Sequence, residues 1–174
     1  MNHTWHWQTN TKHPYLQTSL LNQWHHGFFS RQSWPATPTT LTQVWRPDVP
    51  VYWAKQVHGN QVVDPSDFHQ IVAESTEGQR PEADAVMTSA HDQGTWVCTA
   101  DCTPMLIADA ATGQVAAIHA GWRGTALGIG PKTIQKMQLQ GSQLSDLRVA
   151  MGPAIAGEVY QVSTQVAVEV GKSL

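Results

Sequence analysis

Short apolar runs alternate with turn residues through the middle of the chain. Four such runs follow one another along the chain, the first beginning at residue 83: ADAVMTS, TWVCTA, PMLIADA and QVAAIHAG. Apolar runs of this length between turn residues are typical of buried strands. PVYWAKQVHGNQVV predicts a strand, a turn and another short strand before them, and DLRVAMGPAI predicts a strand and a turn after them.

Two segments change to a helical pattern. After GWRG the apolar positions recur about every four residues, which predicts a helix entered through a glycine-rich turn, with Pro131 as a candidate break. STQVAVEVGKSL predicts a last helix capped by Ser163 or Thr164. The stretch DPSDFHQIVAESTEGQRPE has no clear period, and we interpret it as a polar connector.

The first third of the chain has a different character. Six of the eight tryptophans lie in it, and prolines at positions 35, 38, 47 and 50 exclude long helices there. We therefore expect a loop-rich, tryptophan-packed segment over residues 1–50. We expect it to pack on the remainder of a single domain that spans residues 1–174.

The last predicted helix carries valines at spacing four, Val162, Val166 and Val170, and no strand follows to cover them. We therefore expect the domain to be incomplete at its C-terminal end. Apolar edges left uncovered in this way could drive association, so a homodimer is allowed.

Composition limits the partners. The formal charge is −3, with 10 Lys and Arg against 13 Asp and Glu, and no basic run could follow a phosphate backbone, so we expect no nucleic-acid partner. No apolar stretch is long enough for a membrane helix, and the N-terminus lacks the features of a signal peptide, so we expect a cytoplasmic protein. On one extended strand Cys98 and Cys102 would lie about 13 Å apart, which predicts two free thiols.

Three residues are candidates for metal binding or nucleophilic chemistry: His58, Cys102 and His119. If PMLIADA and QVAAIHAG form a hairpin through residues 110–113, Asp109 faces Gln114 and Cys102 faces Gly121. His119 then lies diagonally across from Cys102 on the same face, with about 7–8 Å between Cα atoms. A slip of one residue would move His119 to the other face. Pro104 should interrupt the ladder and expose the thiol.

The same three residues allow two interpretations. One thiolate and two imidazoles are the ligand count of a catalytic zinc site that keeps its fourth position open. Alternatively, Cys102 is a nucleophile, His119 is its base, and Asp101 or His58 orients the base. Each residue also has a structural explanation, since free cysteines are often small buried apolar residues and His58 could be a turn residue.

The segment GWRG is a second candidate site. Arg123 and backbone amides near a helix start could bind a phosphate or a carboxylate. Alternatively, Arg123 pairs with Asp84 or Asp101 and the glycines serve close packing. Glu82 and Asp84 could hydrogen-bond to a histidine or an arginine of the site without contacting the ligand themselves, but we interpret them as solvated acids.

Five strings, KQVHGNQVV, EADAVMTS, VCTADCTPMLIAD, VAAIHAGWRGTALGI and MGPAI, occur in this order. Together they closely resemble the YfiH family, also called the laccase-domain or polyphenol oxidase family, from about His26 to Val162. The resemblance implies an α+β fold of mixed β-sheets in layers with flanking helices, which agrees with the strand-rich middle of the chain. It also implies that His58, Cys102 and His119 bind one zinc ion and form the catalytic centre.

The resemblance further implies a purine nucleoside enzyme. Its members are described as phosphorolysing adenosine, inosine, guanosine or methylthioadenosine and as deaminating adenosine, so a nucleoside and phosphate are the expected ligands. Family members usually carry an Asn-Arg pair before the QVHG strand, and this chain has none between Arg31 and Lys55. We expect Arg123, Arg31 and Gln56 to contact the substrate instead. The family pattern also continues well past GPAI.

Three alternatives remain open. One is a metal-free cysteine hydrolase or amidase that uses Cys102 and His119. Another is a copper-dependent polyphenol oxidase: copper can occupy a His, His, Cys site, although the chain lacks the His-x-His pairs of a multicopper cluster. The last is an inactive partial domain.

Overall fold

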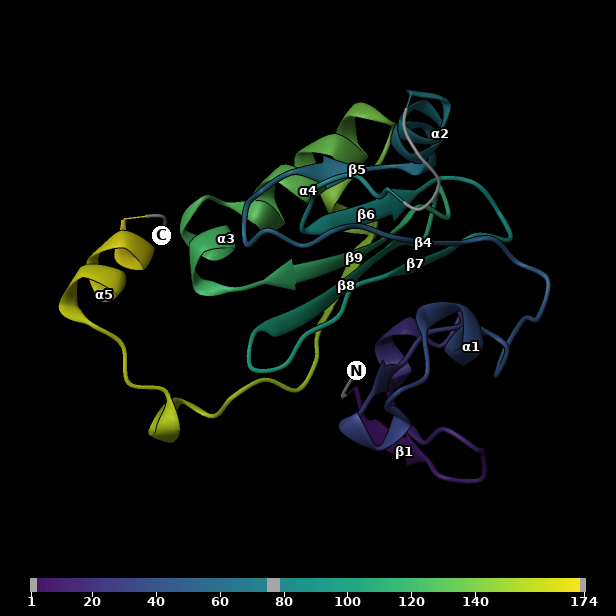
Figure 1. The fold of residues 1–174 in the computed structure, drawn as a ribbon, viewed down its shortest axis with the longest axis horizontal. Helices are drawn as coiled ribbons and strands as arrows, with labels where there is room; N and C mark the ends of the chain where they lie inside the picture. The colour runs from purple at the N-terminus through teal and green to yellow at the C-terminus, as the bar shows by residue number, and fades with distance from the viewer. Residues whose placement is uncertain (1–2, 75–78, 173–174) are drawn as a thin grey trace.

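A five-stranded mixed sheet forms the centre of the molecule, as the computed structural model shows for residues 3–74 and 79–172 (Figure 1). The strand order across this sheet is β10 (Leu147–Met151), β8 (Thr103–Asp109), β9 (Val115–Ala120), β6 (Ala85–Thr88) and β5 (Val62–Val63). β5 pairs with β6 in parallel, and the other neighbours are antiparallel. The predicted α+β class with mixed sheets and flanking helices is confirmed.

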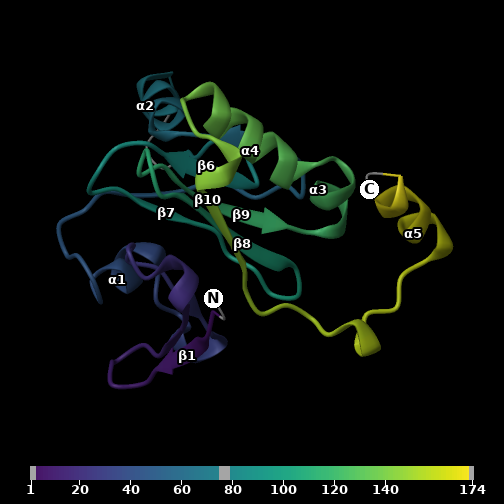
Figure 2. The same ribbon diagram turned by 180° about the vertical axis from the view of Figure 1, so that it is seen from behind.

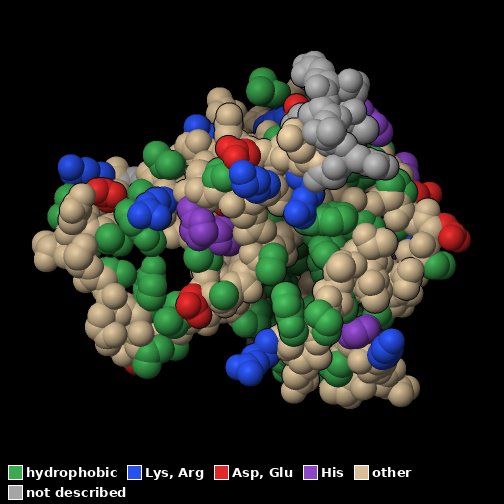
Figure 3. All heavy atoms as spheres, viewed as in Figure 1, with side chains coloured by type: hydrophobic (Ala, Val, Ile, Leu, Met, Phe, Trp, Pro, Cys, Tyr) green, Lys and Arg blue, Asp and Glu red, His purple; other side chains and the backbone are tan. Residues whose placement is uncertain are grey.

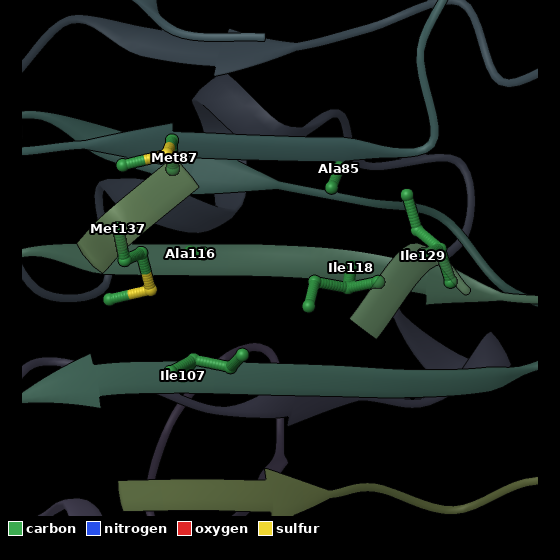
Figure 4. Close-up of a cluster of buried hydrophobic side chains, with 7 residues drawn as sticks. All are labelled: Ala85, Met87, Ile107, Ala116, Ile118, Ile129 and Met137. Carbon is green, nitrogen blue, oxygen red and sulfur yellow. The ribbon is translucent and has the colours of Figure 1, made fainter. Parts of the chain in front are cut away.

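One face of this sheet is covered by α4 (Ile129–Leu139). Side chains at alternate strand positions point toward the helix and form a buried cluster with two of its residues (Figure 4). The members of the cluster are Ala85, Met87, Ile107, Ala116, Ile118, Ile129 and Met137. α2 (Pro65–Glu74) lies at the β5 end of the sheet, where Phe68 packs against Tyr52.

The opposite face of the sheet contacts the N-terminal region. Leu21 and Phe28 pack with Ala108 and Ala150 of the central sheet in a second buried cluster. This region contains a three-stranded sheet of β1 (Trp5–Gln8), β2 (Tyr15–Thr18) and β3 (Phe28–Phe29), followed by α1 (Pro38–Thr42). A parallel pair, β4 (Val51–Trp53) and β7 (Gly94–Trp96), adjoins it. Four aromatic rings pack together between these parts: Tyr15, Phe29, Trp45 and Trp96.

The β8–β9 hairpin has the predicted register. Thr103 pairs with Ala120 and Pro104 with His119, and the turn closes with a hydrogen bond from the Asp109 amide to the Gln114 carbonyl. Pro104 does not interrupt the ladder, so this expectation is wrong. The ladder tolerates it because a proline carbonyl still accepts, here from the Gly152 amide at 2.8 Å.

Two other expectations need correction. The polar connector contains α2, which begins at Pro65 directly after the helix-start residue Asp64; residues 75–78 lie outside the described part. The first third is loop-rich, as expected, and also contains the sheet of β1, β2 and β3. The helix after GWRG is divided, but at Gly128, whose φ of +73° favours glycine, and not at Pro131, which fits the first turn of α4.

The chain beyond β10 is extended and mostly exposed, and it ends in α5 (Thr164–Gly171). The predicted cap is Ser163, whose hydroxyl accepts from the Val166 amide. α5 lies against α3 (Trp122–Ala126), away from the N-terminal sheet (Figure 2). Short 3-10 turns occur at Ser19–Leu21, Arg31–Ser33, Leu144–Asp146 and Gly157–Val159. Within the described ranges, no helix has the length and apolar character needed to cross a membrane.

Candidate metal centre

The three candidate residues converge at one end of the central sheet. His58 comes from the loop between β4 and β5, Cys102 directly precedes β8, and His119 is in β9. Their ligand atoms all lie within 4.8 Å of one another. The two imidazole rings meet edge to face, with centroids 4.8 Å apart. In the space-filling view, histidine side chains gather at the surface near the start of α3 (Figure 3).

The hairpin register brings Cys102 and His119 together. The ladder ends at the pair Thr103 and Ala120, so Cys102 is the first residue outside it. Its side chain is half-buried, and burial raises the pKa of the Cys102 thiol, with the negative charges of Asp101 and Asp84 acting in the same direction. A thiol with a raised pKa is mostly protonated at neutral pH, so a bound cation would be needed to favour the thiolate.

The His58 loop wraps around Asp84. Lys55 forms a bridge with Glu82 and Val62 pairs with Ala85, so residues 56–61 span the same distance as residues 83 and 84. The longer segment must therefore arch away, and the amides of its arch turn toward the Asp84 carboxylate. His58 adopts a φ of +59° in this arch.

Asp84 is fully buried, so its interpretation as a solvated acid is wrong. Its carboxylate accepts from the His119 Nδ1 at 2.8 Å and from backbone amides of the His58 loop. Glu82, by contrast, is at the surface and pairs with Lys55 at 2.8 Å. The sequence offers one signal for this difference: Asp84 lies between two alanines at the start of a buried apolar run.

Two glycines of GWRG allow the close approach of these segments. A Cβ on Gly121 would lie 3.1 Å from the Cys102 Sγ and 3.2 Å from the His58 Cδ2. A Cβ on Gly124 would lie 2.8 Å from the Gly59 carbonyl oxygen. The interpretation of these glycines as packing residues is therefore supported.

The predicted substrate contacts lie in different places. Gln56 forms two hydrogen bonds of 2.7 Å with the backbone of Cys98, one at each end of its amide group. Arg123 is in α3, directly after the site, and its guanidinium lies 4.6 Å from the centroid of the Trp122 ring. Arg31 begins a 3-10 turn in the N-terminal region. Their contacts with a substrate stay predictions.

The donor set fits a soft divalent cation. One thiol and two imidazoles are ligands that zinc and copper accept, and histidine ligands commonly donate their second nitrogen to a carboxylate, as His119 does to Asp84. The fold and the cluster together define the class of this protein. It is a layered α+β protein with a candidate metal site at one end of its central sheet.

Known proteins share both the sequence and the fold. The family described as multi-copper polyphenol oxidoreductase laccase matches residues 38–173. The chain is 48% identical to a purine nucleoside phosphorylase from Synechocystis sp. over 172 residues, 98% of this chain and 64% of that protein. It is 34% identical to one from Mycobacterium bovis over 124 residues, 71% of this chain and 47% of that protein.

Solved structures agree with these matches. A Neisseria meningitidis protein superposes with a TM-score of 0.62 at 32% identity, over 76% of this chain and 49% of that one. YfiH from Bacillus licheniformis superposes with a TM-score of 0.60 at 24% identity, over 77% and 51%, and supports the fold alone. The chain belongs to the YfiH-like laccase-domain family, and it spans 64% of the first relative and about half of the others named here.

Proposed function

We propose that this chain is a purine nucleoside enzyme whose zinc ion is held by His58, Cys102 and His119. The observation that carries the proposal is the convergence of their ligand atoms within 4.8 Å. The purine nucleoside phosphorylase names of the relatives support the substrate class. Because the chain spans only part of those relatives, its own activity has to be measured directly.

The proposed main reaction is phosphorolysis. A phosphate oxygen bonds to the ribose C1′ while the bond from C1′ to the base breaks, and the base leaves with a proton. When bound, zinc would act as a Lewis acid and polarise a substrate oxygen. Arg123 follows the site directly in α3, so its charge can balance the phosphate, and Gln56 and Arg31 are further proposed contacts. Holding both reactants in place lowers the entropic part of the barrier.

A second proposed reaction at the same site is adenosine deamination, in which water adds at the purine C6 and ammonia leaves. The two reactions differ in their products, since phosphorolysis of adenosine yields adenine and ribose 1-phosphate and deamination yields inosine. Adenosine, inosine, guanosine and methylthioadenosine are the proposed substrates.

The first experiment compares the two free thiols. The purified chain is incubated with adenosine, phosphate and zinc, and the products are identified by chromatography and mass. We expect C102A to lose most of the turnover and C98A to keep it, because Cys98 is exposed and contacts Gln56 only through its backbone. Equal turnover in C102A and the unmodified chain would contradict the assignment. If the chain melts cooperatively but yields no product, the result would favour the metal-free cysteine hydrolase.

The metal-free cysteine hydrolase has one observation in its favour. The geometry resembles that of a nucleophile, a base and an orienting acid, formed in this order by Cys102, His119 and Asp84. Asp84 therefore takes the orienting role that the sequence predicts for Asp101 or His58. The raised pKa of the Cys102 thiol opposes it, because reactive cysteines generally have lowered values. Activity that survives a chelator and is lost on alkylation would favour the hydrolase.

A further inference from the structure

We propose that Asp84 is a positioning residue that holds His58 and His119, two of the proposed metal ligands, in a single arrangement. The inference rests on the proposed metal site and adds to it a residue outside the cluster of proposed ligands. The Asp84 side chain is fully buried, and both of its oxygens are occupied by donors from the two ligand segments.

Both segments donate to the same carboxylate. Its Oδ1 accepts from the His58 amide at 3.0 Å and from the His119 Nδ1 at 2.8 Å. Its Oδ2 accepts from the Gly59 amide at 2.7 Å and from the Val57 amide at 3.3 Å. A buried carboxylate needs such donors to offset its lost hydration, so the donors cannot move away without cost.

His119 is held at its backbone and at its ring. Its amide donates to the Asp84 carbonyl at 2.7 Å, while its Nδ1 donates to the Asp84 carboxylate. Donation from Nδ1 requires the proton on that nitrogen, and in the neutral ring Nε2 then keeps its lone pair. Nε2 is then the atom that His119 can offer to a metal.

The carboxylate of Asp84 holds His58 through the backbone of its loop, while the His58 ring packs edge to face on the His119 ring. The His58 φ of +59° is uncommon for a residue with a side chain. Three successive amides, of Val57, His58 and Gly59, point at the Asp84 carboxylate and form a concave anion-binding turn. The negative charge of Asp84 therefore selects the turn that directs the His58 ring toward His119.

Asp109 offers a matched control. It is also fully buried, and its Oδ1 accepts from the amides of Ala111 at 2.7 Å and Thr112 at 2.9 Å. It lies at the other end of β8 from Cys102. If Asp84 were merely structural, D84N would behave like D109N and lower stability without changing metal affinity.

The experiment measures zinc affinity by competition with a chromophoric chelator, for the unmodified chain, D84N, D109N and C102A. We expect D84N to weaken zinc binding about 10- to 100-fold, the usual loss when the carboxylate behind a histidine ligand is removed. D109N should retain the original affinity, and C102A should lose most of it. A folded D84N with unchanged affinity would overturn the role of Asp84.

A metal-free measurement separates this inference from the proposed function. Long-range ¹⁵N NMR of the unmodified chain without metal should show His119 with its proton on Nδ1. A proton on Nε2 would overturn the inference even if zinc binds. If the unmodified chain binds zinc no better than C102A does, the proposed metal site fails, while the tautomer still decides the role of Asp84. If D84N does not fold, the tautomer of His119 in the unmodified chain still tests the role of Asp84.

Discussion

Gly121 is a residue whose added Cβ would meet all three candidate ligands. The position of a Cβ there would be 3.1 Å from Cys102, 3.2 Å from His58 and 3.7 Å from His119. Its φ of −73° is open to any residue, so its backbone conformation does not demand glycine. Space, and not conformation, is therefore the reason for a glycine at this position.

Replacing Gly121 should consequently affect binding more than stability. We expect G121A to weaken zinc binding at least several-fold, because Cys102 and His58 must shift by a few tenths of an ångström to accept the methyl group. The melting temperature should change by no more than a few degrees. Chelator competition and a thermal melt measure the two effects.

The control for this change is G130A. A Cβ on Gly130 in α4 would meet only the Met105 Cε, at an ordinary 3.7 Å, so its zinc affinity should be unchanged. An equal loss of affinity in both variants would mean that Gly121 has no special role.

Among the secondary-structure elements, α4 is tied to β5 and to the start of α2 by one lysine. The Lys136 Nζ donates to the Val62 carbonyl at 3.2 Å and lies 3.0 Å from the Asp64 Oδ2. Burial raises the pKa of Asp64, but hydrogen bonds from Ser66 and Lys136 and the lysine charge lower it more. The pKa of Asp64 is therefore below its ordinary value of 3.8.

This contact predicts a pH-dependent contribution to stability. K136M should lower the free energy of unfolding by about 1 kcal/mol or less at pH 7, since the pair is partly exposed. A carboxyl with a lowered folded-state pKa stabilises the fold above its unfolded pKa, and this is lost as pH falls through the folded value. The cost of K136M should thus shrink below pH 3.8.

Urea titrations at several pH values test this prediction. K132M is the control, since Lys132 is an exposed lysine on the same helix. A K136M cost that equals the K132M cost at pH 7, or that persists unchanged in acid, would show that the Asp64 contact contributes nothing.

At the scale of the whole molecule, the N-terminal sheet and the central sheet share a core. Phe28 of β3 packs with Ala150 of β10, and a Cβ on the nearby Gly152 would overlap the Phe28 ring. No shift of a flexible side-chain end can relieve this overlap, because the ring itself is in the way. We therefore expect residues 1–50 to unfold together with the rest of the described chain.

G152A tests this connection. We expect it to lower the free energy of unfolding by about 1–3 kcal/mol, the usual cost of an added buried methyl group. Tryptophan fluorescence, which reports mainly on the first third, and far-UV circular dichroism should shift together. G157A should leave both unchanged, since a Cβ there meets no atom within 4 Å. Separate transitions in the two signals would contradict a shared core.

Local patterns were sufficient for much of this architecture. Three of the four apolar runs became β6, β8 and β9, only the first two residues of TWVCTA are in a strand (β7), and the loop of residues 110–113 set the hairpin register that joins Cys102 to His119. These features depend on strand period and turn length, which neighbouring residues determine. The sequence pattern does not predict the N-terminal strands or α2, because their apolar residues do not follow one clear period.

The sequence by itself determined the strand-rich middle, the capped last helix and the approach of one thiol to one imidazole. Only the tertiary structure decided that Asp84 is buried and what it binds. Its donors come from residues at least 25 positions away, in the His58 loop and in β9. No local pattern records such contacts, because burial of a carboxylate depends on which segments fold over it.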